Sequence, residues 1–196
     1  MGILGKSITK AIQKGTTRAA YYWALKNNSD EQLVKRSKAN NVLIVDRKII
    51  AYKRGFVVKD GDYNKIYVIK RQAMSGWNAT MKIVDVNNYE FAKVIRKPSF
   101  FNGRDEFELY IEEEYFGSIY QKDRIKPKLY LPALGWTVSG NFTRGGFKVH
   151  DRNQNVVVRI RTANLSYDTY VIEYDDATDE LFVLFVLMAV ELAYHR

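Results

Sequence analysis

The longest uninterrupted apolar stretch of the chain lies near its C-terminus, where residues 181–190 read LFVLFVLMAV. A half-exposed helix would keep a polar stripe and a half-exposed strand would alternate, so this stretch must be buried on every side. Its length is too short to cross a bilayer, which takes about 20 apolar residues. A group of acids that ends with Asp179 and Glu180 comes directly before it, at the end of a helix where the dipole favours negative charge. The pattern predicts a helix over residues 178–193, buried on all faces.

From residue 42 onward the hydrophobic pattern changes to short alternating runs separated by Asn, Asp and Gly, which is typical of β-strands. The predicted strands are 42–45, 49–52, 65–70, 80–86, 90–96, 106–111, 115–120, 136–140, 147–150, 156–161 and 169–174. Many short strands at close spacing indicate an antiparallel sandwich or barrel.

An internal repeat narrows this choice. Residues 81–96 align without gaps on residues 147–162, which pairs Asp85 with Asp151 and Lys93 with Arg159; residues 107–122 follow the same plan with a tighter turn. Each unit is a predicted hairpin with a polar turn. Repeated hairpins favour a sheet that closes on itself, and a closed sheet must enclose something apolar. We therefore predict a mainly β (α+β) fold, a closed antiparallel β-barrel around the central hydrophobic C-terminal helix.

The first 40 residues follow a different pattern, with apolar residues recurring every three or four positions and bases on the other side. This spacing predicts a basic amphipathic helix, weakened at Gly15. We expect two parts, a helical extension over residues 1–40 and a barrel over residues 41–196. The apolar side consists of Leu4, Ile8, Ala11, Ile12, Ala19, Tyr22 and Trp23, and the basic side of Lys6, Lys10, Lys14 and Arg18.

Two interpretations of this extension remain open. A basic amphipathic helix ending in aromatic residues, here Tyr21, Tyr22 and Trp23, is typical of attachment to a membrane surface. The same pattern also fits a helix that packs on its own domain or on a protein partner, with its basic side to water.

Charge is concentrated in the same part of the chain. Of the net charge of +9, the first 60 residues contribute all, because they hold 13 Lys and Arg against 4 acids while the remainder is balanced. Attraction to anionic partners through net charge therefore belongs to the N-terminal part. The chain has no Cys, and lysines interrupt every early apolar stretch that could serve as a secretory signal. We expect a cytoplasmic protein without a spanning segment, attached to membranes at most peripherally.

The sequence resembles a known family at several of these features. The stretch LGWTVSGNFTRGGFKVHDRNQNVVVRI (134–160), the Asp-turn hairpins and the acidic cluster before the final helix are similar to the tubby C-terminal-like superfamily. The resemblance is to its branch of LURP-one-related proteins, small bacterial members and phospholipid scramblases, and covers residues 65–194. It implies a barrel closed around a hydrophobic C-terminal helix. Tubby domains bind phosphoinositides through basic residues, but the resemblance assigns that role to no position here.

Catalytic and metal chemistry are not expected. The two histidines, His150 and His195, lack a second ligand at metal spacing, and no serine lies in a nucleophile motif. Residues 60–64, DGDYN, begin like a calcium loop, but Lys65 stands where such a loop needs Gly. We predict a non-enzymatic protein with no catalytic residues, no metal site and no cofactor.

A second basic segment lies at residues 122–128, where four bases alternate along the chain, with Tyr120 and Tyr130 at its ends. On one extended strand these side chains would share a face and could hold phosphates of lipid or nucleic acid. Alternating lysines also protect exposed edge strands from aggregation.

The leading hypothesis is a non-enzymatic binding domain for membrane surfaces or anionic lipid. The alternative is a protein-interaction or structural module. In that alternative the N-terminal helix docks on its own barrel or on a partner, which includes a second copy of the chain. Nucleic acid is not an expected partner, because the aromatic residues form no evident stacking platform. The predicted lipid- or anion-binding residues are Lys6, Lys10, Lys14, Arg18, Trp23, Lys122, Arg124, Lys126 and Lys128.

Overall fold

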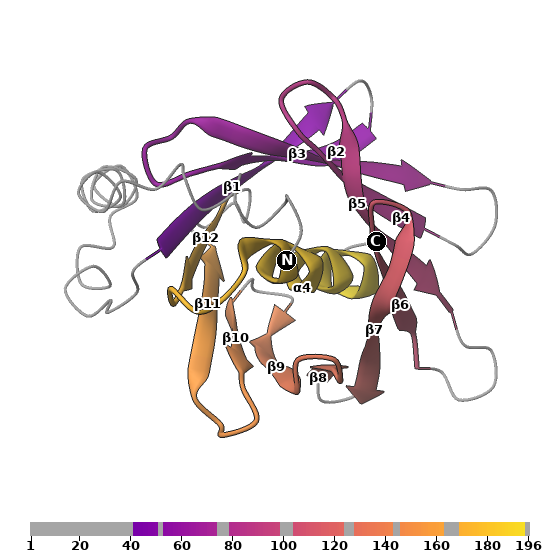
Figure 1. Ribbon diagram of the computed structural model, residues 1–196, viewed down its shortest axis with the longest axis vertical. Helices are drawn as coiled ribbons and strands as arrows, with labels where there is room; N and C mark the ends of the chain where they lie inside the picture. The colour runs from indigo at the N-terminus through magenta and orange to yellow at the C-terminus, as the bar shows by residue number, and fades with distance from the viewer. Residues whose placement is uncertain are drawn as a thin grey trace.

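A computed structural model describes residues 41–50, 53–73, 79–98, 104–123, 128–142, 146–162 and 169–194, which form a closed barrel of β-strands around one helix (Figure 1). The elements are β1 (Asn41–Ile50), β2 (Lys53–Lys59), β3 (Lys65–Ala73), β4 (Ala79–Val84), β5 (Glu90–Lys97), β6 (Glu106–Ile111), β7 (Glu114–Asp123), β8 (Lys128–Leu131), β9 (Trp136–Asn141), β10 (Gly146–His150), β11 (Val156–Thr162), β12 (Thr169–Tyr174) and α4 (Glu180–Tyr194). The predicted N-terminal helix lies outside the described residues.

The strands follow one another around the barrel in sequence order, each antiparallel to its neighbours. The barrel closes where β1 pairs with β12, with Leu43 opposite Ile172 and Val45 opposite Tyr170. This arrangement confirms the predicted closed antiparallel barrel with a central C-terminal helix, and it leaves no unpaired edge among the described strands.

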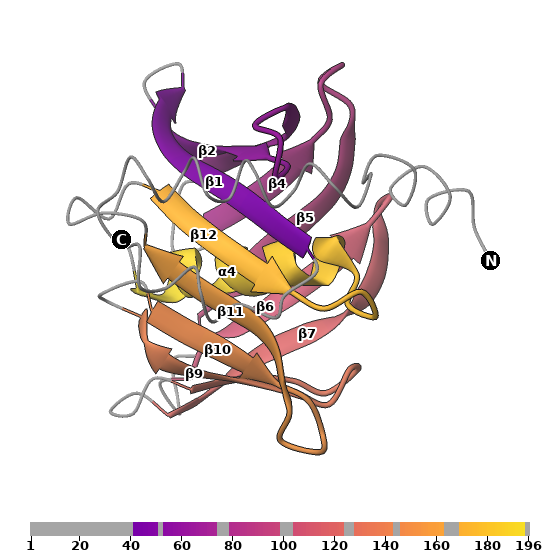
Figure 2. The same ribbon diagram turned by 90° about the vertical axis from the view of Figure 1, so that its left-hand side faces the viewer.

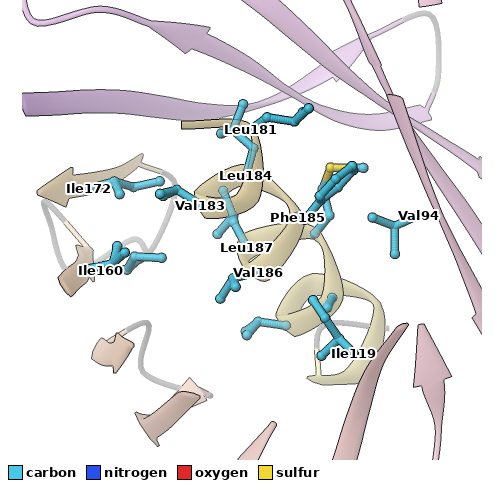
Figure 3. Close-up of a cluster of buried hydrophobic side chains, with 14 of the residues drawn as sticks. Val94, Ile119, Ile160, Ile172, Leu181, Val183, Leu184, Phe185, Val186 and Leu187 are labelled. Carbon is cyan, nitrogen blue, oxygen red and sulfur yellow. The ribbon is translucent and has the colours of Figure 1, made fainter. Parts of the chain in front are cut away.

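Helix α4 fills the interior of the barrel, as the turned view and the close-up show (Figures 2 and 3). Of its 15 residues, 12 are buried, so every face of the helix is enclosed. Strand side chains approach it from different sides, including Ile160 and Ile172 from one and Val94 from another (Figure 3). Burial of each large aliphatic or aromatic side chain contributes about 1.5–3 kcal/mol before chain entropy is subtracted. The absence of a polar side over residues 181–190 is therefore explained by their enclosure within the barrel.

The helix begins at Glu180, two residues later than predicted. The backbone N–H of Leu181 donates to Asp179 Oδ1 at 2.8 Å, so Asp179 caps the first turn. A capping residue lies outside the helical conformation, and this explains the later start.

Polar contacts attach both ends of α4 to the barrel wall. At the N-terminal end, Tyr67 donates to Glu180 Oε1 at 2.7 Å and Tyr174 donates to Oε2 at 3.3 Å. Burial raises the pKa of the Glu180 carboxyl, against the opposing effect of these two hydroxyl donors. At the C-terminal end, Arg47 Nη2 donates to both oxygens of Glu191, at 2.9 and 3.2 Å, and Tyr170 donates to the same carboxylate. These contacts fix the helix along the barrel axis.

The prediction of two separate strands at 42–45 and 49–52 is wrong, because β1 continues through the charged residues between them. Asp46 points outward, where it accepts hydrogen bonds from Lys59 and Thr169. Arg47 reaches Glu191 of the central helix. The sequence analysis also missed β2, whose residues 53–55 resemble a polar loop, and the four-residue β8, which Pro127 and Pro132 enclose.

The hairpin repeat is confirmed for β4–β5 and β10–β11. In each, the first Asp accepts backbone hydrogen bonds from residues two and four positions later, as Asp85 does from Asn87 and Tyr89. The fourth loop residue, Asn88 or Gln154, has a positive φ, and a bulge follows the same position of the first strand. The loop at residues 60–64 has this geometry too, so β2–β3 is a further copy of the hairpin, which the sequence analysis did not include in the repeat.

Candidate functional site

The candidate site has to be sought on the outside of the barrel or at its ends, because α4 occupies the interior. Side chains of α4 such as Leu184 and Leu187 are fully buried against the inward-facing strand residues. The predicted site residues Lys6, Lys10, Lys14, Arg18, Trp23, Arg124 and Lys126 lie outside the described residues. Lys122 and Lys128 are described, and both are exposed.

Lys122 and Lys128 do not belong to one extended segment, as their alternation had suggested. Strand β7 ends at Asp123 and β8 begins at Lys128, so the two lysines lie on neighbouring strands. Each strand is paired on both sides, so the interpretation of these lysines as protection of a sheet edge is wrong. Pro127, which has no N–H to donate, immediately precedes the second strand.

The pairing register of the strands places Lys128 in one row with two further bases on the outer face of the barrel. Lys128 is opposite Ser139 on β9, Ser139 is opposite Lys148 on β10, and Lys148 is opposite Arg159 on β11. Side chains directly opposite one another share a face of the sheet. The residue next to the row along each of these strands packs in the core, as Val138, Val149 and Val158 do, so the row itself points outward. At about 4.8 Å per strand, it spans roughly 14 Å from β8 to β11.

Lys122 adds a fourth base beside this row. Its Nζ lies 4.1 Å from the ring centroid of Tyr130, the outward residue of β8 that follows Lys128 by two positions. We call the exposed set of Lys122, Lys128, Lys148 and Arg159 the cationic row. Ser139 contributes a hydroxyl within it, and His150 lies beyond Lys148 on the same face.

The bases of the cationic row form no ion pair with any carboxylate of the described ranges. The acid opposite Arg159 is Glu173, but its carboxylate binds Arg161 Nη2 at 2.5 Å instead. Like charges directly opposite each other destabilise a sheet. The pairing of Lys148 with Arg159 therefore opposes folding slightly, and no described carboxylate neutralises its charge.

The internal repeat supplies a comparison within the same molecule. Lys82 and Lys93, opposite each other on β4 and β5, occupy the positions equivalent to Lys148 and Arg159. In that copy each base has a carboxylate, since Lys82 Nζ lies 2.8 Å from Glu90 and Lys93 binds Glu113. The residue equivalent to Glu90 in the second copy is Val156. The two copies share a scaffold, but only the second leaves its bases unneutralised.

Sequence reasoning missed Lys148 and Arg159 as site residues. They lie 20 and 31 positions after Lys128 and join it only through strand register. The repeat alignment contained a signal that could have found them, namely the replacement of Glu90 by Val156 beside a conserved pair of bases in the two copies.

Other candidate chemistry is accounted for by local structure. The Asp60 carboxylate accepts hydrogen bonds from the backbone of Asp62 and Asn64 and from the Asn64 amide, which closes a turn. Across the described ranges, no group of three or more His, Asp or Glu residues gathers as a metal site. The helix found in these ranges is not long and apolar enough to span a membrane.

Comparison with known proteins agrees with this geometry. The model of the LURP-one-related family matches residues 41–191. A protein from Arabidopsis thaliana, solved by X-ray crystallography, is similar with a TM-score of 0.52 and 12% sequence identity, over 76% of this chain and 90% of that one. At this identity the likeness shows the fold alone. Among curated proteins, none matches the chain.

Proposed function

Since the chain belongs to the LURP-one-related family, within the tubby C-terminal-like superfamily, we propose that it is a non-enzymatic domain that associates with membrane surfaces or anionic lipid. A filled barrel offers its outer face as the binding surface. The cationic row, whose bases have no carboxylate partner among the described residues, is the observation that carries this proposal.

The physical argument concerns charge. Each Lys or Arg close to an anionic lipid surface contributes about 1 kcal/mol of attraction. Four bases within a few strand spacings could contact neighbouring headgroup phosphates, with the Ser139 hydroxyl as an additional donor. A phosphate bound between Lys148 and Arg159 would also neutralise the two bases and relieve the repulsion between them.

The N-terminal segment belongs to the same proposal. Residues 1–26 include Lys6, Lys10, Lys14 and Arg18, which would add to the attraction, and Trp23, which suits a membrane interface. Arg124 and Lys126, in the connection between β7 and β8, are included as further contributors. Attachment of this kind is peripheral and depends on salt.

A second candidate function is a protein-interaction or structural module whose N-terminal segment docks on its own barrel. It is favoured by a set of aliphatic residues that face outward from the barrel and are nevertheless buried, which is considered below.

Co-sedimentation of the full chain with vesicles tests the proposal. We expect binding to vesicles that contain phosphatidylserine and little binding to pure phosphatidylcholine. The double variant Lys148→Ala/Arg159→Ala should weaken binding roughly 30-fold, the effect of removing about 2 kcal/mol of attraction. The variant Lys6→Ala/Lys10→Ala/Lys14→Ala/Arg18→Ala measures the contribution of the N-terminal bases separately.

The repeat provides the matched control, Lys82→Ala/Lys93→Ala, which removes the same number of charges from an equivalent hairpin. Because Glu90 and Glu113 already neutralise those lysines, this variant should bind nearly as well as the unaltered chain. Equal losses in both double variants would mean that net charge alone acts. An unaltered chain that ignores anionic vesicles would refute the proposal.

A further inference from the structure

Five aliphatic residues are buried without belonging to the core around α4. They are Val42, Ile44, Val68, Val84 and Val171, each between 2% and 8% exposed, and none packs in the cluster that surrounds the helix. Strand register explains the difference, since their neighbours along each strand, such as Leu43 and Ile172, point inward. We call these five residues the outer cluster.

The outer cluster covers one continuous side of the barrel. Ile44 is opposite Val171 and Val42 is opposite Glu173, across the junction of β1 and β12. Val68 is opposite Val84 across β3 and β4. Val57 on β2, which is opposite Val68 and diagonal to Ile44, connects the two groups. The side extends over four strand spacings, or about 19 Å.

A carboxylate on the same side is also hidden. Glu173 points outward beside Val42, yet it is only 1% exposed. In the ranges that the structure describes, no helix or second sheet layer lies outside the barrel. Tyr120 on β7, by contrast, also points outward and is 41% exposed. The outer cluster therefore has the character of a covered interface.

We propose that residues 4–23 of the same chain cover the outer cluster as an amphipathic helix. Residue 40 joins directly to β1, the strand that carries Val42 and Ile44, so the segment is tethered at this surface and its effective concentration there is high. Twenty helical residues measure about 30 Å, enough to cross the 19 Å of the cluster. Residues 24–40 are long enough to return the chain to Asn41.

The pattern of the segment fits this surface. Its apolar side, which includes Ile8 and Ile12, would face the valines, and Lys6, Lys10, Lys14 and Arg18 would remain outward. Asp46 and Glu173 on this side already bind Lys59 and Arg161, so the fit rests on the apolar side of the segment and not on charge. The docked segment would keep these bases on the outer surface of the protein, where they would add to the attraction of an anionic surface.

Cysteine labelling of the full chain without lipid tests this inference separately from membrane binding. The chain has no Cys, so Val171→Cys gives one reporter in the outer cluster and Tyr120→Cys one exposed reference. Cys at 171 should react with a maleimide much more slowly than Cys at 120. Adding Ile8→Lys/Ile12→Lys should speed the reaction at 171 about tenfold and leave 120 unchanged. Adding Lys6→Ala/Lys10→Ala, on the basic side, should change neither.

Several results would overturn the inference. Equal labelling rates at positions 171 and 120, or no effect of Ile8→Lys/Ile12→Lys on the rate at 171, would show that the segment does not cover the outer cluster. Slow labelling at 171 that is lost on dilution would show that a second copy covers it. Slow labelling that arises only with vesicles would show that lipid covers it. Val42→Cys serves as a second reporter in case Val171→Cys disturbs folding, which the circular dichroism melting curve reports. As a positive check, Ile12→Cys with Ile44→Cys should form an intramolecular disulfide, and Ile12→Cys with Tyr120→Cys should not.

Discussion

Lys148 and Arg159 lie directly opposite each other on β10 and β11, both exposed and both without a carboxylate partner among the described residues. Their counterparts in the repeat, Lys82 and Lys93, keep the same register but bind Glu90 and Glu113. A surface that only had to be soluble would gain stability from such acids. Their absence from the second copy is the reason to assign binding to that side of the barrel.

Replacement of Lys148 by Glu should stabilise the fold while it weakens binding. The new carboxylate would lie opposite Arg159 and replace a repulsion by an attraction, worth about 0.2–1 kcal/mol. Urea unfolding should show the gain at low salt and a smaller gain at high salt. Lys82→Glu is the control, because it places an acid beside Glu90 and should destabilise. If both variants destabilise alike, Lys148 has a partner that this account lacks.

The stability of the barrel should depend on pH through Glu180. Burial raises the pKa of this carboxyl, so the folded state holds the proton more tightly than the unfolded state. The resulting contribution is fully present below the unfolded pKa, near pH 4, and is lost as pH rises through the folded pKa. Glu180→Gln removes the titration, so its stability relative to the unaltered chain should improve from pH 4 to pH 8. A difference that stays constant with pH would contradict the raised pKa.

Loss of Arg47 should destabilise through Glu191. The Glu191 side chain is 4% exposed and Arg47 is 24% exposed, so removal of the guanidinium leaves a buried carboxylate without its cation, although Tyr170 still donates a hydrogen bond to it. We expect Arg47→Met to cost about 2–3 kcal/mol, less than a fully buried pair because Arg47 is partly solvated. In a double-mutant cycle with Glu191→Leu, the second change should recover much of the loss. Strictly additive losses would show that the pair is not coupled.

The repeated loops offer a test of backbone geometry. Gln154 has a φ of 66°, a left-handed conformation that costs a residue with a side chain about 1 kcal/mol or more. Gln154→Gly should therefore stabilise the protein by about 0.5–1 kcal/mol in thermal or urea unfolding. Asn153→Gly, one position earlier and without positive φ, should not stabilise. A gain at Asn153 and none at Gln154 would contradict the loop geometry.

Part of this architecture is readable in the sequence for physical reasons. The stretch at residues 181–190 has neither helical nor strand amphipathicity, and only full enclosure satisfies it. Asp85 and Asp151 mark their hairpins because the turn uses their carboxylates. In contrast, β1 runs through Asp46 and Arg47, whose partners are distant in sequence, so local pattern misplaced the strand boundary.

The candidate site was only partly readable. Lys122 and Lys128 were visible as a charge run along the chain, but their junction with Lys148 and Arg159 depends on the register of four strands. Register is fixed by closure of the barrel, which local periodicity does not determine. The predicted residues Lys6, Lys10, Lys14, Arg18 and Trp23, together with Arg124 and Lys126, remain predictions.

The most direct test of anion binding at the cationic row is amide chemical-shift mapping of the full chain by NMR, titrated with soluble inositol hexakisphosphate and with short-chain phosphatidylserine. The account predicts that both ligands shift the amides of Ser139, Lys148 and Arg159 most, and those of Lys82 and Lys93 little. Shifts for the lipid alone would restrict the site to membranes. Shifts of equal size on both hairpins, or on neither, would contradict the assignment of binding to the cationic row.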